Sequence, residues 1–346
     1  METNEVLKII KDRVFIIAEL SANHNGSLDI AIETIRAAKR AGADCIKLQT
    51  YTADTMTINS RKPGFTIEGT IWDGRNLYEL YQEAYTPWEW HETLFKTAKK
   101  EGLVCFSSPF DKSAVDFLES LNVPAYKIAS FEITDIPLIE YVASKGKPVI
   151  ISTGIASNED IELALDACKR MGNDDIAVLK CTSSYPAPIE EANMSMVKDL
   201  AERYNVISGL SDHTIGSTAP VVATCFGARI IEKHFILDRS VGGPDASFSM
   251  NEDEFKAMVS AVREAEKAIG SVDYNLTEKQ KKARDFSRSV YVTEDIKEGE
   301  VFTDKNVRCI RPGYGMHPKH YKETLGKKAI KDLEKGDPMS LKFIKK

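Results

Sequence analysis

The stretch GLSDHTIGSTAPVVATCFGARIIEKHFIL, residues 209–237, contains two apolar runs separated by one helical length. Each run carries a polar cluster at or near its end, SDH at 211–213 and EKH at 232–234. Parallel strands joined by a right-handed crossover point the same way, so their carboxyl ends meet at one edge of the sheet. We therefore expect His213 and His234 to lie at the same end of two neighbouring strands.

This histidine pair has two interpretations. Two imidazoles with carboxylates nearby can hold a divalent metal ion and leave coordination positions open. Alternatively, each histidine is a hydrogen-bonded core residue, which is the commoner role of a histidine in an apolar run. The stretch by itself leaves both interpretations open.

The rest of the chain repeats the same alternation of apolar runs and helical patterns. The predicted strands are 14–20, 44–50, 103–107, 125–130, 148–153, 176–182, 206–210 and 229–235. The predicted helices are 28–41, 88–101, 112–120, 136–144, 159–171, 194–204, 218–226 and 252–269. Eight strand–helix units in roughly 260 residues predict a (β/α)8 TIM barrel. A doubly wound sheet is the alternative, but no glycine-rich dinucleotide fingerprint follows the first strand.

The composition changes after the last predicted helix. We expect a barrel domain over residues 1–272, a polar linker over 273–286 and a small second domain over 287–346. About sixty residues can bury only a marginal core, so the second domain is expected to lean on another surface. Residues 51–87, an aromatic-rich connection, are far longer than an ordinary βα loop, which predicts either a substrate lid or an oligomer contact.

Composition also excludes several classes of function. The formal net charge of −6 argues against a general nucleic-acid footprint. No apolar run is long enough to cross a membrane, and the charged N-terminus lacks the apolar core of a signal peptide. The six cysteines are scattered without a C-x-x-C motif. This usage is typical of a reduced cytoplasmic protein.

Nearly every predicted strand ends in a polar group, at the end of a barrel where chemistry is located. Lys47 and Lys127 lie within apolar strands, where a charge is costly unless an anion meets it. They therefore indicate a phosphate or carboxylate ligand. Two alternatives remain: an internal salt bridge with Glu19 or Glu132, or a Schiff-base aldolase in which a desolvated lysine is the nucleophile.

Eight motifs at these strand ends resemble the sialic acid synthase family along nearly the whole chain. They are FIIAELSANHNGS (15–27), K-x-Q-T-Y-T (47–52), CFSSPF (105–110), AYKIASFE (125–132), STGIAS (152–157), KCTSSYP (180–186), GLSDHT (209–214) and EKHFILD (232–238). That family condenses phosphoenolpyruvate with an amino sugar to make nonulosonic acids. The segment 288–346, with RPGYG at 311–315, is similar to the small antifreeze-like (SAF) domain of the family.

Within the family, IIAELSANH (16–24) and IWDGRNLYELYQEAYTPWEWH (71–91) are most similar to the pseudaminic acid branch. This resemblance implies the acceptor 2,4-diacetamido-2,4,6-trideoxy-L-altrose, with pseudaminic acid and phosphate as products. Legionaminic or N-acetylneuraminic acid synthesis by the same chemistry is the nearest alternative. A Schiff-base aldolase and a non-enzymatic carbohydrate-binding protein with an inactive barrel are more distant ones.

The resemblance also implies roles for individual residues. The positions matching catalytic residues are Glu19, Lys47, Lys127, His213 and His234, of which the two histidines match ligands of Mn²⁺ or Mg²⁺. The positions matching phosphoenolpyruvate contacts are Lys47, Ser108, Lys127, Ser130, Ser152, Ser183 and Ser211. The positions matching sugar contacts are Gln49, Glu132, Tyr185, Asp245 and Arg311. Arg311 matches an arginine that reaches the barrel of a partner subunit, which implies a domain-swapped homodimer.

Overall fold

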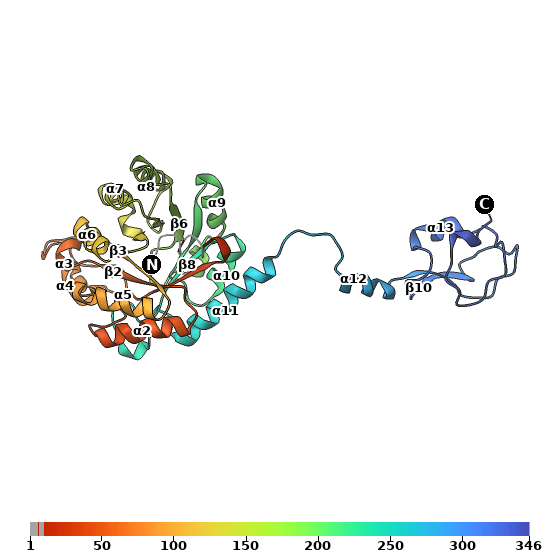
Figure 1. Cartoon of the computed structure of the whole chain (residues 1–346), viewed down its shortest axis with the longest axis horizontal. Helices are drawn as coiled ribbons and strands as arrows, with labels where there is room; N and C mark the ends of the chain where they lie inside the picture. The colour runs from red at the N-terminus through yellow and green to blue at the C-terminus, as the bar shows by residue number, and fades with distance from the viewer. Residues whose placement is uncertain (1–5, 7–9, 346) are drawn as a thin grey trace. The chain divides into compact units, whose positions relative to one another are not determined.

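The computed structural model describes Val6 and residues 10–345. The chain divides into two compact units, Met1–Gly270 and Ser271–Lys346. The first unit is a closed barrel of parallel strands in the order β1 to β8, with helices around its outside (Figure 1). The TIM barrel expected from the sequence is confirmed.

The observed elements follow the predicted ones closely. The strands are β1 (Phe15–Glu19), β2 (Cys45–Thr50), β3 (Val104–Pro109), β4 (Tyr126–Ile128), β5 (Val149–Ser152), β6 (Ile176–Cys181), β7 (Ile207–Asp212) and β8 (Ile230–His234). The helices around them are α2 (Leu28–Arg40), α5 (His91–Lys100), α6 (Lys112–Ser120), α7 (Ile136–Ala143), α8 (Asn158–Arg170), α9 (Ser195–Tyr204), α10 (Thr218–Cys225) and α11 (Glu252–Ile269).

The fourth strand is shorter than predicted. β4 ends at Ile128, and the chain then turns into the 3-10 helix η2 (Ser130–Thr134). Ser130 and Glu132 therefore lie in a turn beyond the strand and not on the strand itself. The apolar run at 125–130 could not reveal this, because a buried turn and a buried strand have the same composition.

The inward side chains of the barrel change character along the strands. One end of the interior is filled by a cluster that includes Phe15, Phe106, Ile150, Leu179 and Ile230. Farther along the strands the same face carries the polar groups described below. Gly209 allows β7 to approach β8, because a Cβ at this position would lie 2.3 Å from the carbonyl oxygen of Ile230.

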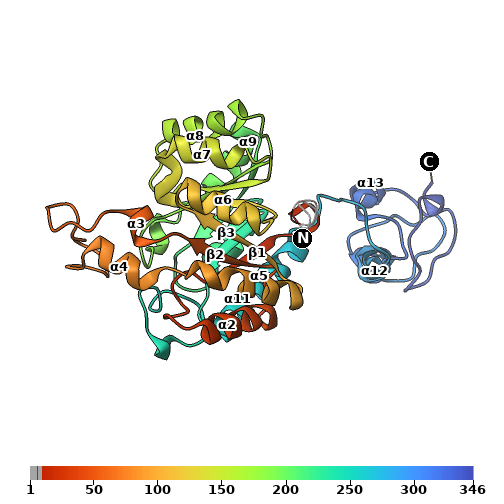
Figure 2. The same ribbon diagram turned by 60° about the vertical axis from the view of Figure 1, so that its left-hand side comes forward.

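The long connection after β2 is ordered in the structure. It contains α3 (Ala53–Met56) and α4 (Leu77–Ala84), which Figure 2 shows at one side of the first unit. Two buried histidines fix its ends. His91 Nε2 lies 2.8 Å from Thr50 Oγ1, and His24 Nε2 lies 3.1 Å from Thr86 Oγ1.

The second unit has a small core of its own. The antiparallel strands β9 (Ser289–Val292) and β10 (Val307–Ile310) pack with Ile296, Phe302 and Leu333. The short helices are α12 (Glu278–Ala283) and α13 (Tyr321–Thr324). α12 lies in the segment expected to be a polar linker, and Thr277 caps its start by accepting a hydrogen bond from Gln280. Within the described residues, we find no helix with both the length and the apolar character needed to span a bilayer.

Candidate active site

A buried charged cluster lies inside the barrel at the carboxyl ends of the strands. Lys47 Nζ lies 2.6 Å from Glu19 Oε2 and 3.5 Å from Glu232 Oε1. It also donates a hydrogen bond of 3.2 Å to Ser108 Oγ. Of the two salt-bridge partners considered from the sequence, Glu19 is the one that pairs with a lysine. Among the described residues, Glu132 forms no ion pair, and its Oε2 is buried without a hydrogen-bond partner.

The second lysine lies on the other side of Glu232. Lys127 Nζ donates hydrogen bonds of 2.6 Å to Ser152 Oγ and 3.0 Å to the carbonyl oxygen of Ile128. It lies 3.9 Å from Glu232 Oε1, which also accepts a hydrogen bond of 3.3 Å from Ser211. Glu232 thus lies between the two lysines, although it was not among the predicted site residues. Its spacing from His234 on one face of β8 was the signal that could have identified it.

Burial controls the protonation of this cluster. It raises the pKa of Glu19 to about 7, with the Lys47 charge opposing the rise and the Glu232 charge adding to it. Burial alone would lower the pKa of Lys47, but Glu19 and Glu232 outweigh it and raise that pKa. Burial lowers the pKa of Lys127. The cluster balances two lysines against two carboxylates, so its charge can adjust by a proton when an anion enters.

The two histidines meet as the alternation of strands predicted. Their ring centroids are 5.4 Å apart, at an angle of 59°. His213 Nδ1 lies 2.9 Å from the carbonyl oxygen of Thr182, so this nitrogen is assigned the proton. His234 Nδ1 is buried, has no hydrogen-bond partner within residues 10–345, and lies 3.8 Å from Asp245 Oδ2.

These groups fit an open metal site. Burial, followed by the nearby His213 charge, lowers the pKa of His234 well below its usual value, so this imidazole is in the neutral form that binds metal. Burial would also lower the pKa of His213, but Cys181 and the carbonyl oxygen of Thr182 outweigh it and raise that pKa, so a metal ion would displace a proton from His213. In the part of the chain that the structure describes, no three His, Cys, Asp or Glu side chains are gathered closely enough to enclose an ion. Two imidazoles supply only two ligands, so an ion held by this pair would keep positions for water or substrate.

A hydrogen-bonded chain connects the charged cluster to Asp245. Gln49 Nε2 donates to Glu19 Oε1 at 3.1 Å and to Ser21 Oγ at 3.0 Å. Ser21 Oγ in turn donates to Asp245 Oδ2 at 2.5 Å. Burial raises the pKa of Asp245, and the hydrogen bond from Ser21 opposes the rise. Ser21 was not predicted as a site residue, since a single serine after a strand carries no distinctive pattern.

A cavity of about 390 Å³ opens above these groups. The barrel side of its lining includes six predicted residues, Gln49, Ser130, Glu132, Tyr185, His234 and Asp245. Much of the remaining lining comes from the loop at 51–87, namely Tyr51, Met56, Ile67, Thr70, Trp72, Leu77, Leu80, Tyr81 and Ala84. The cavity therefore has a polar floor and a largely apolar wall.

Trp72 connects the loop at 51–87 to the barrel of the same chain. Its Nε1 donates a hydrogen bond of 3.0 Å to the carbonyl oxygen of Pro244. Its ring lies 5.5 Å from the ring of Tyr185, which is itself 4.3 Å from the ring of His213. The sequence could not pair Trp72 with Pro244, because the two residues are 172 positions apart.

Of the predicted residues not yet placed, Ser183 lies in the barrel and Arg311 lies in the second unit. Ser130 and Ser183 meet, with 2.6 Å between their hydroxyl oxygens. Arg311 is exposed and belongs to the second unit, so its place in the barrel of a partner stays a prediction.

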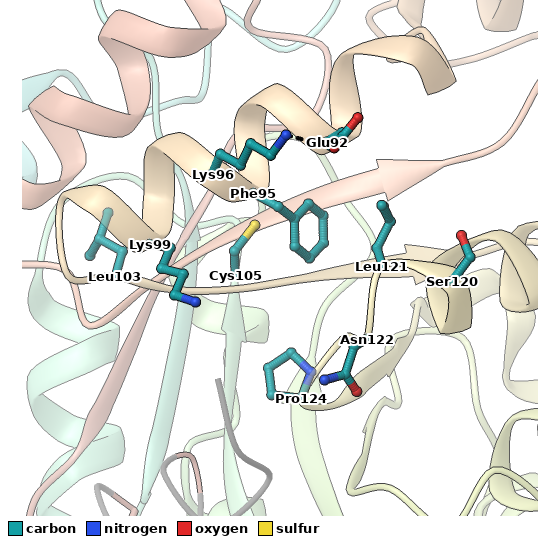
Figure 3. Close-up of a pocket in the computed structure, with 10 residues that line it drawn as sticks. All are labelled: Glu92, Phe95, Lys96, Lys99, Leu103, Cys105, Ser120, Leu121, Asn122 and Pro124. Carbon is teal, nitrogen blue, oxygen red and sulfur yellow. Dashed lines mark hydrogen bonds and ion pairs between the residues drawn. The ribbon is translucent and has the colours of Figure 1, made fainter.

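A separate groove of about 350 Å³ lies on the flank of the barrel, between α5 and the turn after α6. Its lining includes Phe95, Cys105 and Leu121, and Lys96 pairs with Glu92 at 2.6 Å on its rim (Figure 3). None of the predicted site residues lines it, so the candidate site is the cavity at the carboxyl ends of the strands.

The fold and the site define a TIM-barrel protein with a buried lysine pair and a histidine pair below one cavity. The chain matches the model of the NeuB family over residues 34–274 and that of the SAF domain over residues 287–344. It belongs to the NeuB family, which confirms the family and the second domain expected from the sequence.

Its relatives share most of its length. It is 53% identical over 327 residues to a pseudaminic acid synthase of Campylobacter jejuni, covering 94% of this chain and 95% of that one. It is 50% identical over 332 residues to a pseudaminic acid synthase of Helicobacter pylori, covering 96% and 98%. The crystal structure of an N-acetylneuraminic acid (sialic acid) synthetase from Leptospira borgpetersenii in complex with citrate superposes with a TM-score of 0.71 at 30% identity, covering 79% and 90%.

Proposed function

We propose that this protein condenses phosphoenolpyruvate with 2,4-diacetamido-2,4,6-trideoxy-L-altrose and water to give pseudaminic acid and phosphate. The observation that carries this proposal is the identity of 53% and 50% with two pseudaminic acid synthases over nearly all of each chain. Identity with the sialic acid synthetase of known structure is only 30%. Legionaminic and N-acetylneuraminic acid synthesis remain the alternatives that the test below separates.

The proposed reaction forms one carbon–carbon bond and one carbon–oxygen bond and breaks another carbon–oxygen bond, while the aldehyde oxygen takes up a proton and becomes a hydroxyl group. C3 of phosphoenolpyruvate attacks the aldehyde carbon of the open-chain sugar, which leaves an oxocarbenium-like centre at C2. The oxygen of water adds at C2 and loses a proton. The tetrahedral intermediate then collapses by cleavage of the bond between C2 and the phosphate-bearing oxygen, which releases phosphate.

The charged cluster provides groups for the anionic substrate. Lys47 and Lys127, with Ser108 and Ser152 beside them, would bind its phosphate and carboxylate. This assignment is supported by the hydrogen bonds that already orient each lysine toward a serine. Glu19 would accept the proton of the attacking water, since a carboxyl group whose pKa is near 7 suits general base catalysis at neutral pH.

His213 and His234 are the residues that would hold the divalent ion. A bound Mn²⁺ or Mg²⁺ would act as a Lewis acid on the aldehyde oxygen of the sugar. The support is the ring separation of 5.4 Å and the unpartnered Nδ1 of His234. Asp245 would keep its carboxylate close to this ring and face the sugar with Gln49, Glu132 and Tyr185.

We assign the loop at 51–87 to the role of a lid over the sugar. Its tryptophan contacts the barrel of its own chain, and its side chains supply the apolar wall of the cavity. A 6-deoxy sugar presents a methyl group where mannosamine carries a hydroxymethyl, so an apolar wall suits it. Such a wall discriminates by about 1–3 kcal/mol unless it is also sterically closed.

The second unit would complete the site of a partner. We propose that Arg311 reaches the barrel of the other subunit in a domain-swapped homodimer, with 1–272 as the barrel domain, 273–286 as the linker and 287–346 as the SAF domain. The match to the SAF domain supports this assignment. All six cysteines are free, which supports a cytoplasmic location.

Phosphate release from phosphoenolpyruvate tests the proposal. The acceptors are the diacetamido-altrose sugar, its trideoxy-mannose isomer and N-acetylmannosamine, each with and without EDTA. We expect EDTA-sensitive release with the altrose sugar alone, restored by excess Mn²⁺ or Mg²⁺. Comparable rates with N-acetylmannosamine would contradict the choice of acceptor, and release that resists EDTA would contradict the metal site.

A further inference from the structure

A second buried ion pair lies beside the histidines, on the outward face of the barrel strands. Lys233 Nζ lies 2.6 Å from Asp212 Oδ2, and each side chain is only 1% exposed. The two residues are register partners on β7 and β8. Each directly precedes one of the histidines, His213 or His234, in the chain.

Stability alone does not account for this pair. Removing two charges from water is expensive, and well-packed apolar side chains of similar volume hold such a position at least as well. The outward neighbours on the same strands, Leu210 and Ile231, are buried aliphatic residues of the layer between barrel and helices. The two strands are also joined by backbone pairing from Gly209 to Asp212.

The side chains of Asp212 and Lys233 both form hydrogen bonds with the backbone of Thr214, the residue that follows His213. Asp212 Oδ1 accepts a hydrogen bond of 2.9 Å from the backbone N–H of Thr214, and Lys233 Nζ donates to the carbonyl oxygen of Thr214. The ion pair therefore connects the chain leaving β7 to the end of β8. His213 lies between the two attachment points of this connection, Asp212 at the end of β7 and Thr214 beyond it.

His213 also forms two hydrogen bonds with the segment that follows β6. Its Nδ1 meets the carbonyl oxygen of Thr182, and its own carbonyl oxygen accepts a hydrogen bond of 2.9 Å from the N–H of Ala187. These contacts tie His213 to the segment after β6. The hydrogen bond from Lys233 to the carbonyl oxygen of Thr214 and the ion pair of Lys233 with Asp212 connect the residues on either side of His213 to β8, where His234 lies.

We infer that Asp212 and Lys233 form a positioning pair that sets the separation of His213 and His234. The inference rests on the proposed function, since it concerns the residues that would hold the ion. Neither residue touches substrate in this account. They act through the backbone on either side of His213, as groups outside the ligand shell do when they orient a metal ligand.

The test measures Mn²⁺ affinity without substrate, from the electron paramagnetic resonance signal of free Mn²⁺. The double variant Asp212→Leu with Lys233→Met replaces the pair by apolar side chains and is expected to remain folded. We expect its dissociation constant for Mn²⁺ to rise about ten- to a hundredfold, the usual effect of losing a group that orients a metal ligand. Lys233→Arg preserves the charge pair and is expected to stay close to wild type.

Asp44→Asn is the matched control. Asp44 Oδ2 lies 2.8 Å from Arg263 Nη2 and accepts the N–H of Ile16 at the amino end of the barrel. Weakening the pair of Asp44 with Arg263 should lower the melting temperature and leave the Mn²⁺ affinity unchanged. The control separates a loss of fold stability from a loss of histidine positioning.

Each outcome decides the inference. A folded double variant that binds Mn²⁺ like wild type would overturn it and leave the proposed function intact. Wild-type protein that binds no Mn²⁺ would overturn the proposed metal site and the inference with it. If the double variant does not fold, Asp212→Asn with Lys233→Met decides, because it leaves no unpaired charge and removes the hydrogen bond from Lys233 to Thr214. An unchanged Mn²⁺ affinity in that variant overturns the positioning role.

Discussion

The floor and the wall of the cavity differ in polarity, since the floor is polar and the wall is largely apolar. Beneath the polar lining of the floor, and hydrogen-bonded to it through Gln49, lie the charged side chains Glu19, Lys47, Lys127 and Glu232 on four different strands of the closed barrel. The wall comes largely from one loop with apolar side chains. The difference teaches that the chemistry common to every acceptor sits on rigid elements, whereas the choice of acceptor depends on a segment that can vary without disturbing the barrel.

The largest expected effect comes from the floor. Glu19→Gln keeps the shape of the side chain and removes its ability to accept a proton. Turnover should fall by about 10²–10⁴-fold, the usual contribution of a general base, while phosphoenolpyruvate affinity stays within a few-fold of wild type. Steady-state kinetics and calorimetric titration measure the two quantities, and turnover close to wild type would remove Glu19 from the mechanism.

Lys127→Met should weaken phosphoenolpyruvate binding. A hydrogen bond to a charged group contributes about 1.5–3 kcal/mol, so the dissociation constant should rise roughly 10- to 150-fold. Lys180→Met is the matched control, because Lys180 is another buried lysine whose Nζ instead donates to Cys181 and Thr182. Equal losses in both variants would contradict the assignment, and borohydride trapping of substrate on Lys127 would favour the Schiff-base alternative.

Acid should weaken the attachment of the loop at 51–87 to the barrel. Burial lowers the pKa of His24 and of His91 to about 4, from a usual value near 6.5. Between these values the unfolded chain binds more protons than the folded one, so the free energy of unfolding falls as the pH falls. The loss from pH 7 to pH 5 is about 2 kcal/mol per histidine.

Urea unfolding at several pH values measures this slope. We expect His91→Asn, which cannot be protonated, to remove the contribution of His91, about 2 kcal/mol of the fall between pH 7 and 5. His317→Asn, at an exposed position of the second unit, is the control. A slope unchanged by His91→Asn would contradict the claim that a neutral histidine anchors this end of the loop.

A smaller effect is expected within the wall. Trp72→Phe preserves a ring beside Tyr185 and removes the hydrogen bond to Pro244. A neutral hydrogen bond contributes about 0.5–1.5 kcal/mol net, so KM for the sugar should rise roughly 2- to 12-fold with kcat almost unchanged. Ile71→Ala alters the neighbouring, exposed residue and should change neither constant. A fall in kcat alone would argue against a lid that acts by binding the sugar.

The sequence predicted the barrel because its signals are local. Each strand and helix shows its own periodicity, and polar residues close the strands at the end where His213 and His234 meet. Two kinds of feature were missed. Glu232 gains its importance from lying between two lysines on other strands, and the contact of Trp72 with Pro244 joins distant parts of the chain. Neither juxtaposition has a local pattern, because both depend on the closed barrel.

The central claim is that floor and wall have separate tasks, and the ratio of kcat/KM for two acceptors tests it most directly. The diacetamido-altrose sugar and N-acetylmannosamine are compared in wild type, in Ser152→Ala on the floor and in Trp72→Ala on the wall. We predict that Ser152→Ala lowers both values by the same factor and leaves the ratio unchanged, whereas Trp72→Ala reduces the ratio about tenfold. A ratio that changes in the floor variant, or that stays constant in the wall variant, would contradict the account.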